Sequence, residues 1–222
     1  DATSGEYGAY RMLADFAALK YNLLLGTQMV TKGLDLPKVS LVGIVSADHG
    51  MDLPDFRASE KTFARLLQVA GRSGRTEAPG EVVIQTFDPE NEVIGFAARQ
   101  DYCGFFAREI KMRKDHEFPP FARLANIELS GKSEEQVSRE MLSFRRRLED
   151  RMLLTKVVAE ILGPAPCPHA FVKGLHRRHL LIKSVRMPLI SRLLADWEKS
   201  EARYGVASAV KIRIDIDPVN LM

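Results

Sequence analysis

The stretch Gln-Val-Ala-Gly-Arg-Ser-Gly-Arg at residues 68–75 places two arginines three positions apart, and a glycine directly precedes each of them. On a helix, Arg72 and Arg75 would point the same way, because residues three apart lie about one turn from each other. A guanidinium group donates a planar fork of hydrogen bonds to phosphate oxygens, and glycine lets the backbone approach another surface closely. The pattern indicates a helix end that contacts phosphate. A solvated basic helix end that stops at a glycine is the alternative interpretation.

A second stretch, Gly-Thr-Gln-Met-Val-Thr-Lys-Gly at residues 26–33, follows the apolar run Leu23–Leu25. A short apolar run of this kind predicts a buried strand that leads into a backbone turn. The stretch is not a Walker A loop, because Lys32 precedes Gly33 and no Ser or Thr follows. Thr27 has a second interpretation, as a residue that only caps a helix.

Strands and helices alternate outward from these two stretches. Besides the strand at residues 23–25, strands are expected at 41–45 and 81–86, and helices at 5–20 and 57–73. Such alternation predicts a parallel sheet with covering helices, and so an α/β domain over residues 1–90.

The pattern changes after two consecutive prolines, Pro119 and Pro120. Residues 91–120 are predicted to be a helical connector that these prolines end. Residues 121–222 are predicted to form an α+β sandwich with two long helices on one face of the sheet. Its strands are expected around 125–129, 158–162, 178–183 and 211–217, with 170–173 left open, and its helices around 134–148 and 188–203.

Two acidic residues lie in or before the predicted helix at residues 57–73. Asp48 follows a predicted strand, at the end where α/β proteins bind ligands, and it is either paired with a basic residue across a cleft or a plain loop aspartate. Arg57 and Glu60 are expected to form a structural pair three residues apart on a helix.

The run from residue 26 to residue 75 resembles the primosomal replication-restart helicases of the PriA type, which belong to superfamily 2. The likeness rests on GTQM followed by KG, on PDFRASE at residues 54–60, and on QVAGRSGR. EFPPFARLANIELSG, ILGPAPCP and the ending IDIDPVNLM resemble the carboxyl-terminal domain of the same family. The resemblance covers essentially the whole chain. It implies that residues 1–90 are the carboxyl-terminal half of a RecA-like helicase lobe that carries motifs V and VI.

The resemblance also implies which residues contact nucleotide and DNA. Arg72 and Arg75 would be arginine fingers, which can contribute about 10³ to 10⁵ in rate to phosphoryl transfer. Gln68 and Gly71 would lie at the same ATP site, although Gln68 could be only a solvated helix residue. The DNA-binding residues of motif V would be Gly26, Thr27, Gln28, Lys32 and Gly33, although Gly26 and Gly33 could serve only backbone geometry.

Two basic runs lie in the predicted carboxyl-terminal domain. Arg145, Arg146 and Arg147 follow one another on an expected helix, and Arg177 and Arg178 form part of a second run. Contacts from such groups to phosphates bind nucleic acid in a salt-dependent, sequence-independent way. The resemblance implies single-stranded or forked DNA as their ligand, whereas a solvated face is the more common meaning of a charge run.

Composition sets only broad bounds. The 222 residues are 45% hydrophobic and 27% charged, with a net charge of +3, which is typical of a soluble globular protein and compatible with a nucleic-acid partner. No apolar run approaches the roughly 18 residues that suggest a membrane span. Cys103 and Cys167 are not in a CxxC spacing, so no metal site is expected and both are predicted to be buried thiols in a reducing cytoplasm.

The predicted function is the carboxyl-terminal part of an ATP-dependent 3′-to-5′ DNA helicase that restarts stalled forks and helps to load the replicative helicase. The chain starts at Asp1 and has neither a Walker A lysine nor a Walker B box, so we expect a fragment that is inactive alone. The resemblance implies ATP and Mg²⁺ in the intact protein, with the family's zinc module upstream. The implied partners are single-stranded and forked DNA, single-stranded DNA-binding protein and primosome proteins, in the bacterial cytoplasm at the nucleoid. The alternatives are another superfamily 2 translocase in repair or recombination, and a non-catalytic DNA-binding module.

Overall fold

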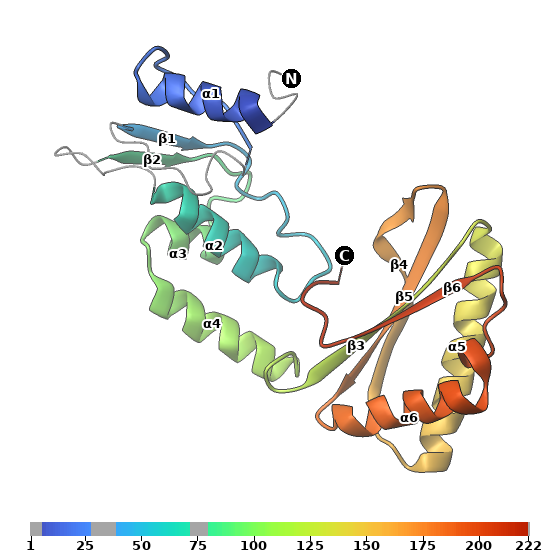
Figure 1. The fold of residues 1–222 in the computed structure, drawn as a ribbon. Helices are drawn as coiled ribbons and strands as arrows, with labels where there is room; N and C mark the ends of the chain where they lie inside the picture. Colours follow the sequence, from blue (N-terminus) through green and yellow to red (C-terminus); the bar gives the residue numbers. More distant parts are fainter. Residues whose placement is uncertain (1–5, 28–38, 72–79, 222) are drawn as a thin grey trace. The chain divides into compact units, whose positions relative to one another are not determined.

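The computed structural model describes residues 6–27, 39–71 and 80–221, and it divides into two compact units (Figure 1). Unit 1 comprises Asp1–Asp52 and Ser59–Phe105, and unit 2 comprises Leu53–Ala58 and Phe106–Met222. The division along the chain is therefore not a single cut, because a short segment inside the first half packs with the second.

Unit 1 contains a parallel pair of strands, as the alternating pattern predicts. The strands β1 (Leu41–Ile44) and β2 (Glu81–Ile84) pair in register from Leu41 with Glu81 to Ile44 with Ile84. The helices are α1 (Glu6–Ala17), α2 (Ala58–Ala70), α3 (Glu92–Ala98) and α4 (Tyr102–Asp115), the last of which runs on into unit 2.

The strand predicted at Leu23–Leu25 is wrong. These residues are irregular, and the side chains of Leu23 and Leu25 are 70% and 80% exposed. Three apolar residues are too few to show a period, so the pattern could not separate a strand from a connecting segment.

The core of unit 1 lies between α2, α3 and the start of α4. Phe63 and Leu66 of α2 are 3% and 1% exposed, and they pack with Val93 and Ile94 of α3 in one apolar cluster. The ring of Phe63 stacks on Phe105 with centroids 4.0 Å apart. One apolar face of α2 is thereby committed to the core, as its helical periodicity predicts.

Unit 2 is a four-stranded antiparallel sheet in the order β4-β5-β3-β6 with two long helices (Figure 1). The strands predicted at 158–162 and left open at 170–173 are parts of one long strand, whose pairing shifts at two places. The elements are β3 (Arg123–Gly131), α5 (Glu134–Thr155), β4 (Glu160–Val172), β5 (Leu175–Ser184), α6 (Met187–Ser200), the short 3-10 turn η2 (Ala202–Gly205) and β6 (Lys211–Ile216).

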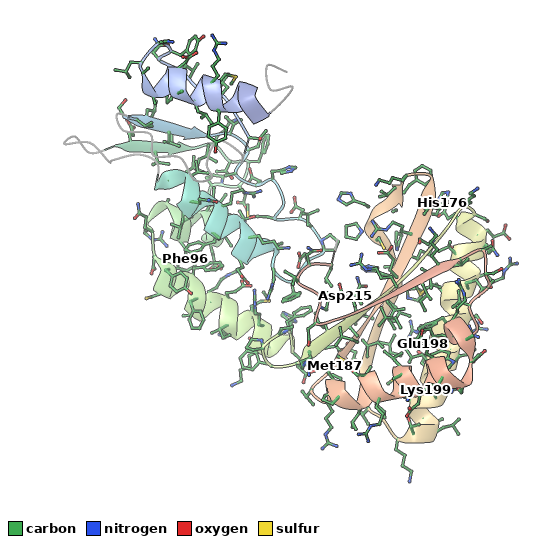
Figure 2. The ribbon with its side chains drawn as sticks, in the orientation of Figure 1. Phe96, His176, Met187, Glu198, Lys199 and Asp215 are labelled. Carbon is green, nitrogen blue, oxygen red and sulfur yellow. The ribbon has the colours of Figure 1, made fainter. Side chains whose placement is uncertain are left out.

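Both helices of unit 2 pack on the same face of the sheet, which confirms the predicted arrangement. Phe144 of α5 and Trp197 of α6 stack with centroids 5.0 Å apart, and both are fully buried with Ile127 of β3. Met187 at the start of α6 is also fully buried, whereas the Lys199 side chain near the other end is 80% exposed (Figure 2). The amphipathic pattern of each helix thus predicts the face that it buries.

The segment Leu53–Ala58 supplies one ring to a small second core of unit 2. Phe56 stacks on Phe118 with centroids 5.7 Å apart and nearly parallel planes. The guanidinium of Arg113 lies 5.4 Å from the Phe56 ring, and the Lys183 ammonium lies 5.6 Å from the Phe118 ring. Two cations therefore flank a pair of stacked rings, an arrangement that cation–π attraction favours.

Candidate functional site

The loop at the carboxyl end of β1 is tied to the end of β2 by Asp48. Its carboxylate accepts a hydrogen bond from the Thr86 hydroxyl at 2.5 Å and another from the Phe87 backbone N–H at 3.0 Å. These donors, Thr86 first, lower the pKa of Asp48 below its usual value. Of the two interpretations of Asp48, the structure shows a loop carboxylate with a local structural role, and pairing with a basic residue stays a prediction.

The same loop is held from the other side by α2. Arg65 donates from its guanidinium to the carbonyl of His49 and, at 3.1 Å, to the hydroxyl of Thr62, which is 1% exposed. Burial lowers the pKa of Arg65. The loop after β1 is therefore bonded to both β2 and α2.

The end of α2 carries the described part of the phosphate-contacting stretch. Gln68 is exposed, and the Gly71 N–H donates to the carbonyl of Leu67 at 2.9 Å, so helical hydrogen bonding extends to Gly71. A Cβ at position 71 would lie 3.3 Å from that carbonyl oxygen, which is a tight contact. Arg72 and Arg75 lie outside the described residues, so their role as arginine fingers stays a prediction.

The second predicted stretch is described only at its start. Gly26 and Thr27 are exposed and lie in irregular chain. Gln28, Lys32 and Gly33 lie outside the described residues. Contact with DNA by this stretch stays a prediction, and so does the alternative in which Thr27 caps a helix.

Arg57, which is predicted to pair with Glu60, makes contacts within unit 2. Its guanidinium donates to the carbonyl of Val219 at 3.3 Å and lies 5.4 Å from the Phe56 ring. Its backbone N–H donates to the carboxylate of the buried Asp55 at 3.0 Å. Arg57 therefore belongs to the segment that unit 2 holds, and its pairing with Glu60 stays a prediction.

The arginines of the first basic run differ in what they contact. Arg145 donates to Glu149 at 2.8 Å and to the carbonyl of Gly163. Arg147 donates to Glu201 at 3.3 Å. Arg146 is exposed and has no polar partner among the residues that the structure describes. Two of the three charges are thus locally paired.

The second basic run lies on β5 and is also paired with acids. Arg177 donates twice to Glu128, at 2.9 and 2.6 Å, and this hydrogen bonding raises the pKa of Arg177. Arg178 lies 3.8 Å from Glu134, a looser ion pair. A DNA role for Arg177 and Arg178 stays a prediction, with the neighbouring acids as competitors for any phosphate.

The two cysteines have different surroundings, so one prediction is wrong. Cys167 is buried, and burial raises the pKa of its thiol to about 11. Cys103 on α4 is exposed rather than buried. Within the described ranges, no three His, Cys, Asp or Glu residues are grouped so that they could hold a metal ion. Nor do those ranges contain a helix of the length and apolarity needed to cross a membrane.

Sequence reasoning missed several groups that organise these surfaces. Glu201 accepts hydrogen bonds from the indole N–H of Trp197 at 2.8 Å and from Arg147 and Arg151, which lie 54 and 50 positions before it. The four-residue spacing of Trp197 and Glu201 was a usable signal, because such residues are neighbours on a helix. The pairing of Arg177 with Glu128 depends on strand register, and no short-range pattern reveals it.

Two family models match consecutive parts of the chain. The helicase conserved C-terminal domain matches residues 9–77, and the primosomal protein N C-terminal domain matches residues 114–219. The first match falls mainly in unit 1 and the second within unit 2.

Curated relatives cover nearly all of the chain. The replication restart protein PriA of Bacillus subtilis is 36% identical over 222 residues, which is 100% of this chain and 27% of that protein. The PriA of Chlamydia muridarum is 38% identical over 208 residues, covering 94% of this chain and 27% of that protein. The PriA of a Synechocystis species is 37% identical over 220 residues, covering 99% and 26%. The chain therefore spans about a quarter of the length of these relatives.

Proposed function

We infer that this chain, a relative of the PriA replication restart proteins along its whole length, is the carboxyl-terminal part of a DNA helicase that restarts stalled replication forks. One observation carries this proposal. A helicase domain match and a primosomal domain match occur in one chain, in that order. A superfamily 2 translocase from repair or recombination would be expected to share the first match and lack the second.

In this proposal, Arg72 and Arg75 stabilise the negative charge that develops on the phosphoryl group of ATP, as arginine fingers do. Gln68 fits a role at the same ATP site, because it is exposed at the end of α2. Gly71 fits as well, because it offers backbone without a side chain at the last helical turn. The chain has no Walker A lysine or Walker B box, so ATP and Mg²⁺ would be bound mainly by residues outside it, and the chain alone would be inactive.

DNA contact would come from two places. Gly26, Thr27, Gln28, Lys32 and Gly33 would contact the DNA backbone near the motor. In the carboxyl-terminal domain, Arg146 would contribute more than Arg145, Arg147, Arg177 or Arg178. The reason is that Arg146 is exposed, whereas those four arginines lie against acids that a phosphate would have to displace.

The wider assignments rest on the family resemblance. We propose 3′-to-5′ unwinding, loading of the replicative helicase, and contacts with single-stranded DNA-binding protein and primosome proteins in the bacterial cytoplasm at the nucleoid. The relatives, which are replication restart proteins, support the replication-restart role, and the finer assignments extend it.

The motor part of this proposal is tested by DNA-dependent ATP hydrolysis in the full-length protein that contains this chain. Arg72→Ala and Arg75→Ala are each expected to lower kcat, by up to about 10³ or more for the dominant finger. Arg99→Ala, which removes an exposed arginine from the end of α3, is the matched control and should keep the activity. If the unaltered protein hydrolyses no ATP with any single-stranded or forked DNA, the non-catalytic module is the better interpretation.

The DNA part is tested by fluorescence anisotropy with forked DNA at several salt concentrations. Arg146→Ala is expected to weaken binding and to reduce the slope of log affinity against log salt by about one phosphate contact. Arg145→Ala, which breaks an existing ion pair, should change the slope less. Equal slopes for all three proteins would show that the first basic run is a solvated face.

A further inference from the structure

The loop after β1 is bonded on both sides through polar contacts that the motor motifs alone do not explain. On the β2 side, the Asp48 carboxylate accepts from the Thr86 hydroxyl and from the Phe87 N–H. On the α2 side, Arg65 donates to the carbonyl of His49, the next residue after Asp48. A continuous series of hydrogen bonds therefore runs from the end of β2, through this loop, to α2.

The loop itself is tightly turned, so the two sets of bonds act on one rigid piece. The N–H of Ala47 donates to the carbonyl of Gln85 at 2.9 Å, which extends the parallel pairing past β1. The N–H of Met51 then donates to the carbonyl of Asp48 at 3.0 Å, which closes a turn around Asp48 and His49. Residues at the carboxyl ends of parallel strands are where α/β proteins place ligands.

Apolar packing of α2 does not by itself fix where the helix ends. Phe63 and Leu66 pack α2 into the core of unit 1, and the hydrophobic effect that favours their burial is not directional. Hydrogen bonds are directional and weaken steeply when their geometry changes. Arg65 lies six residues before Gly71, which corresponds to about 9 Å along a helix. Its bond to the His49 carbonyl therefore ties α2 to the loop after β1 near the end from which Arg72 and Arg75 follow in the chain.

We propose that Asp48 and Arg65 are positioning residues, which together hold the carboxyl end of α2, from which the chain continues to Arg72 and Arg75, against the loop at the carboxyl end of β1. This inference rests on the proposed function, because it assigns these residues to the ATP reaction. Neither residue contacts the nucleotide in this proposal. Each acts through the loop that follows β1, to which Asp48 belongs and which Arg65 contacts at His49.

The charge state of Asp48 suits this role. Its hydrogen bonds to Thr86 and Phe87 lower its pKa, so the carboxylate stays ionised and keeps both acceptor positions at neutral pH. An asparagine can reproduce most of the pattern, because its amide oxygen can accept from the Phe87 N–H and its amide nitrogen can donate to the Thr86 oxygen. An alanine can reproduce neither bond.

The test measures kcat and KM for DNA-dependent ATP hydrolysis in the full-length protein. Asp48→Ala is expected to lower kcat at least about tenfold, because a misplacement of about 1 Å can cost up to about 100-fold, while KM for ATP changes less than about twofold. Asp48→Asn is expected to restore most of the lost kcat. Asp52→Ala, which removes an exposed carboxylate from the next turn of the chain, is the matched control and should leave both constants unchanged.

A double variant separates positioning from two unrelated losses. Arg65→Met keeps the aliphatic length of Arg65 and removes its donors, so it is expected to lower kcat as Asp48→Ala does. If both residues act through one loop, Asp48→Ala with Arg65→Met should be little worse than either change alone. Multiplicative effects of the two changes would overturn the proposal, and so would a wild-type kcat in Asp48→Ala.

The failure of this inference is distinguishable from the failure of the proposed function. If Arg72→Ala and Arg75→Ala abolish hydrolysis and Asp48→Ala does not affect it, only the positioning role is wrong. If the unaltered protein has no DNA-dependent ATP hydrolysis, the proposed function is wrong and the positioning role falls with it.

Discussion

Replacing Phe56 by alanine is expected to destabilise unit 2, although Phe56 lies between two parts of unit 1 in the chain. The ring is 9% exposed and stacks on Phe118, with the Arg113 guanidinium over its face. It also belongs to the apolar cluster that Leu124 and Leu221 complete. The substitution removes all of these ring contacts and leaves a cavity beside two buried leucines.

The expected loss of stability is about 3 kcal/mol. Truncation of a buried phenylalanine to alanine costs about 3 to 5 kcal/mol, and the lower end applies because Phe56 comes from a short segment that can partly relax into the cavity. With a urea dependence of about 2 kcal/mol per M, the midpoint of unfolding should fall by about 1.5 M.

The assay uses the single tryptophan of the chain, Trp197, which is fully buried in the core of unit 2. Its fluorescence in urea follows the unfolding of that unit and is little affected by events in unit 1. Phe87→Ala is the matched control, because the Phe87 side chain is 88% exposed and belongs to unit 1. Its removal should change stability by less than about 0.5 kcal/mol.

A common midpoint for Phe56→Ala and Phe87→Ala would refute this reasoning. It would mean that the Phe56 ring contributes nothing to unit 2 in solution. A midpoint that falls by more than about 3 M would also be inconsistent, since it exceeds what one truncated ring can remove.

Two further predictions concern titratable groups in the chain. A thiol reagent at pH 8 should modify Cys103 and spare Cys167 in the folded protein, because Cys103 is exposed while burial raises the pKa of Cys167 to about 11. In denaturant, both cysteines should react. Similar reaction rates at the two cysteines in the folded protein would contradict this prediction. The Trp197 indole N–H, and after it Arg147 and Arg151, lower the pKa of Glu201 in the folded protein. The carboxylate therefore stabilises the fold at pH values above its unfolded pKa of about 4.3, and this stabilisation is lost as the pH falls through the lower folded pKa. Glu201→Gln should therefore unfold with less pH dependence between about pH 5 and pH 3, measured by Trp197 fluorescence, and an unchanged dependence would show that the carboxylate contributes nothing.

Elements with a clear period were predictable from the chain alone. The alternation of Ile212, Ile214 and Ile216 with charged residues predicts β6, and the structure places that strand at Lys211–Ile216. The apolar faces of α5 and α6 likewise predict that both helices cover one side of a sheet. These signals are local, because each needs only the spacing of neighbours in one segment.

Errors arose where the signal was too short or the partner too distant. Leu23–Leu25 has too few residues to show a period, and composition alone cannot decide whether Cys103 faces the core or solvent. The bond between Asp48 and Thr86 joins residues 38 positions apart, and it depends on how two strands end beside each other. Arg72 and Arg75, the most informative residues of the chain, owe their assignment to the family resemblance rather than to any geometry.

The return of Leu53–Ala58 into unit 2 has a consequence for how such proteins can be recombined. A truncation after Phe105 would leave the Phe56 ring behind without the Phe118 ring that covers it, and would expose an apolar loop to aggregation. A chimaera that exchanges the carboxyl-terminal domain between relatives therefore needs to exchange the PDFRASE segment with it. Over evolutionary time, the two pieces are expected to be inherited as one module, although residues 59–105 of unit 1 lie between them in the chain.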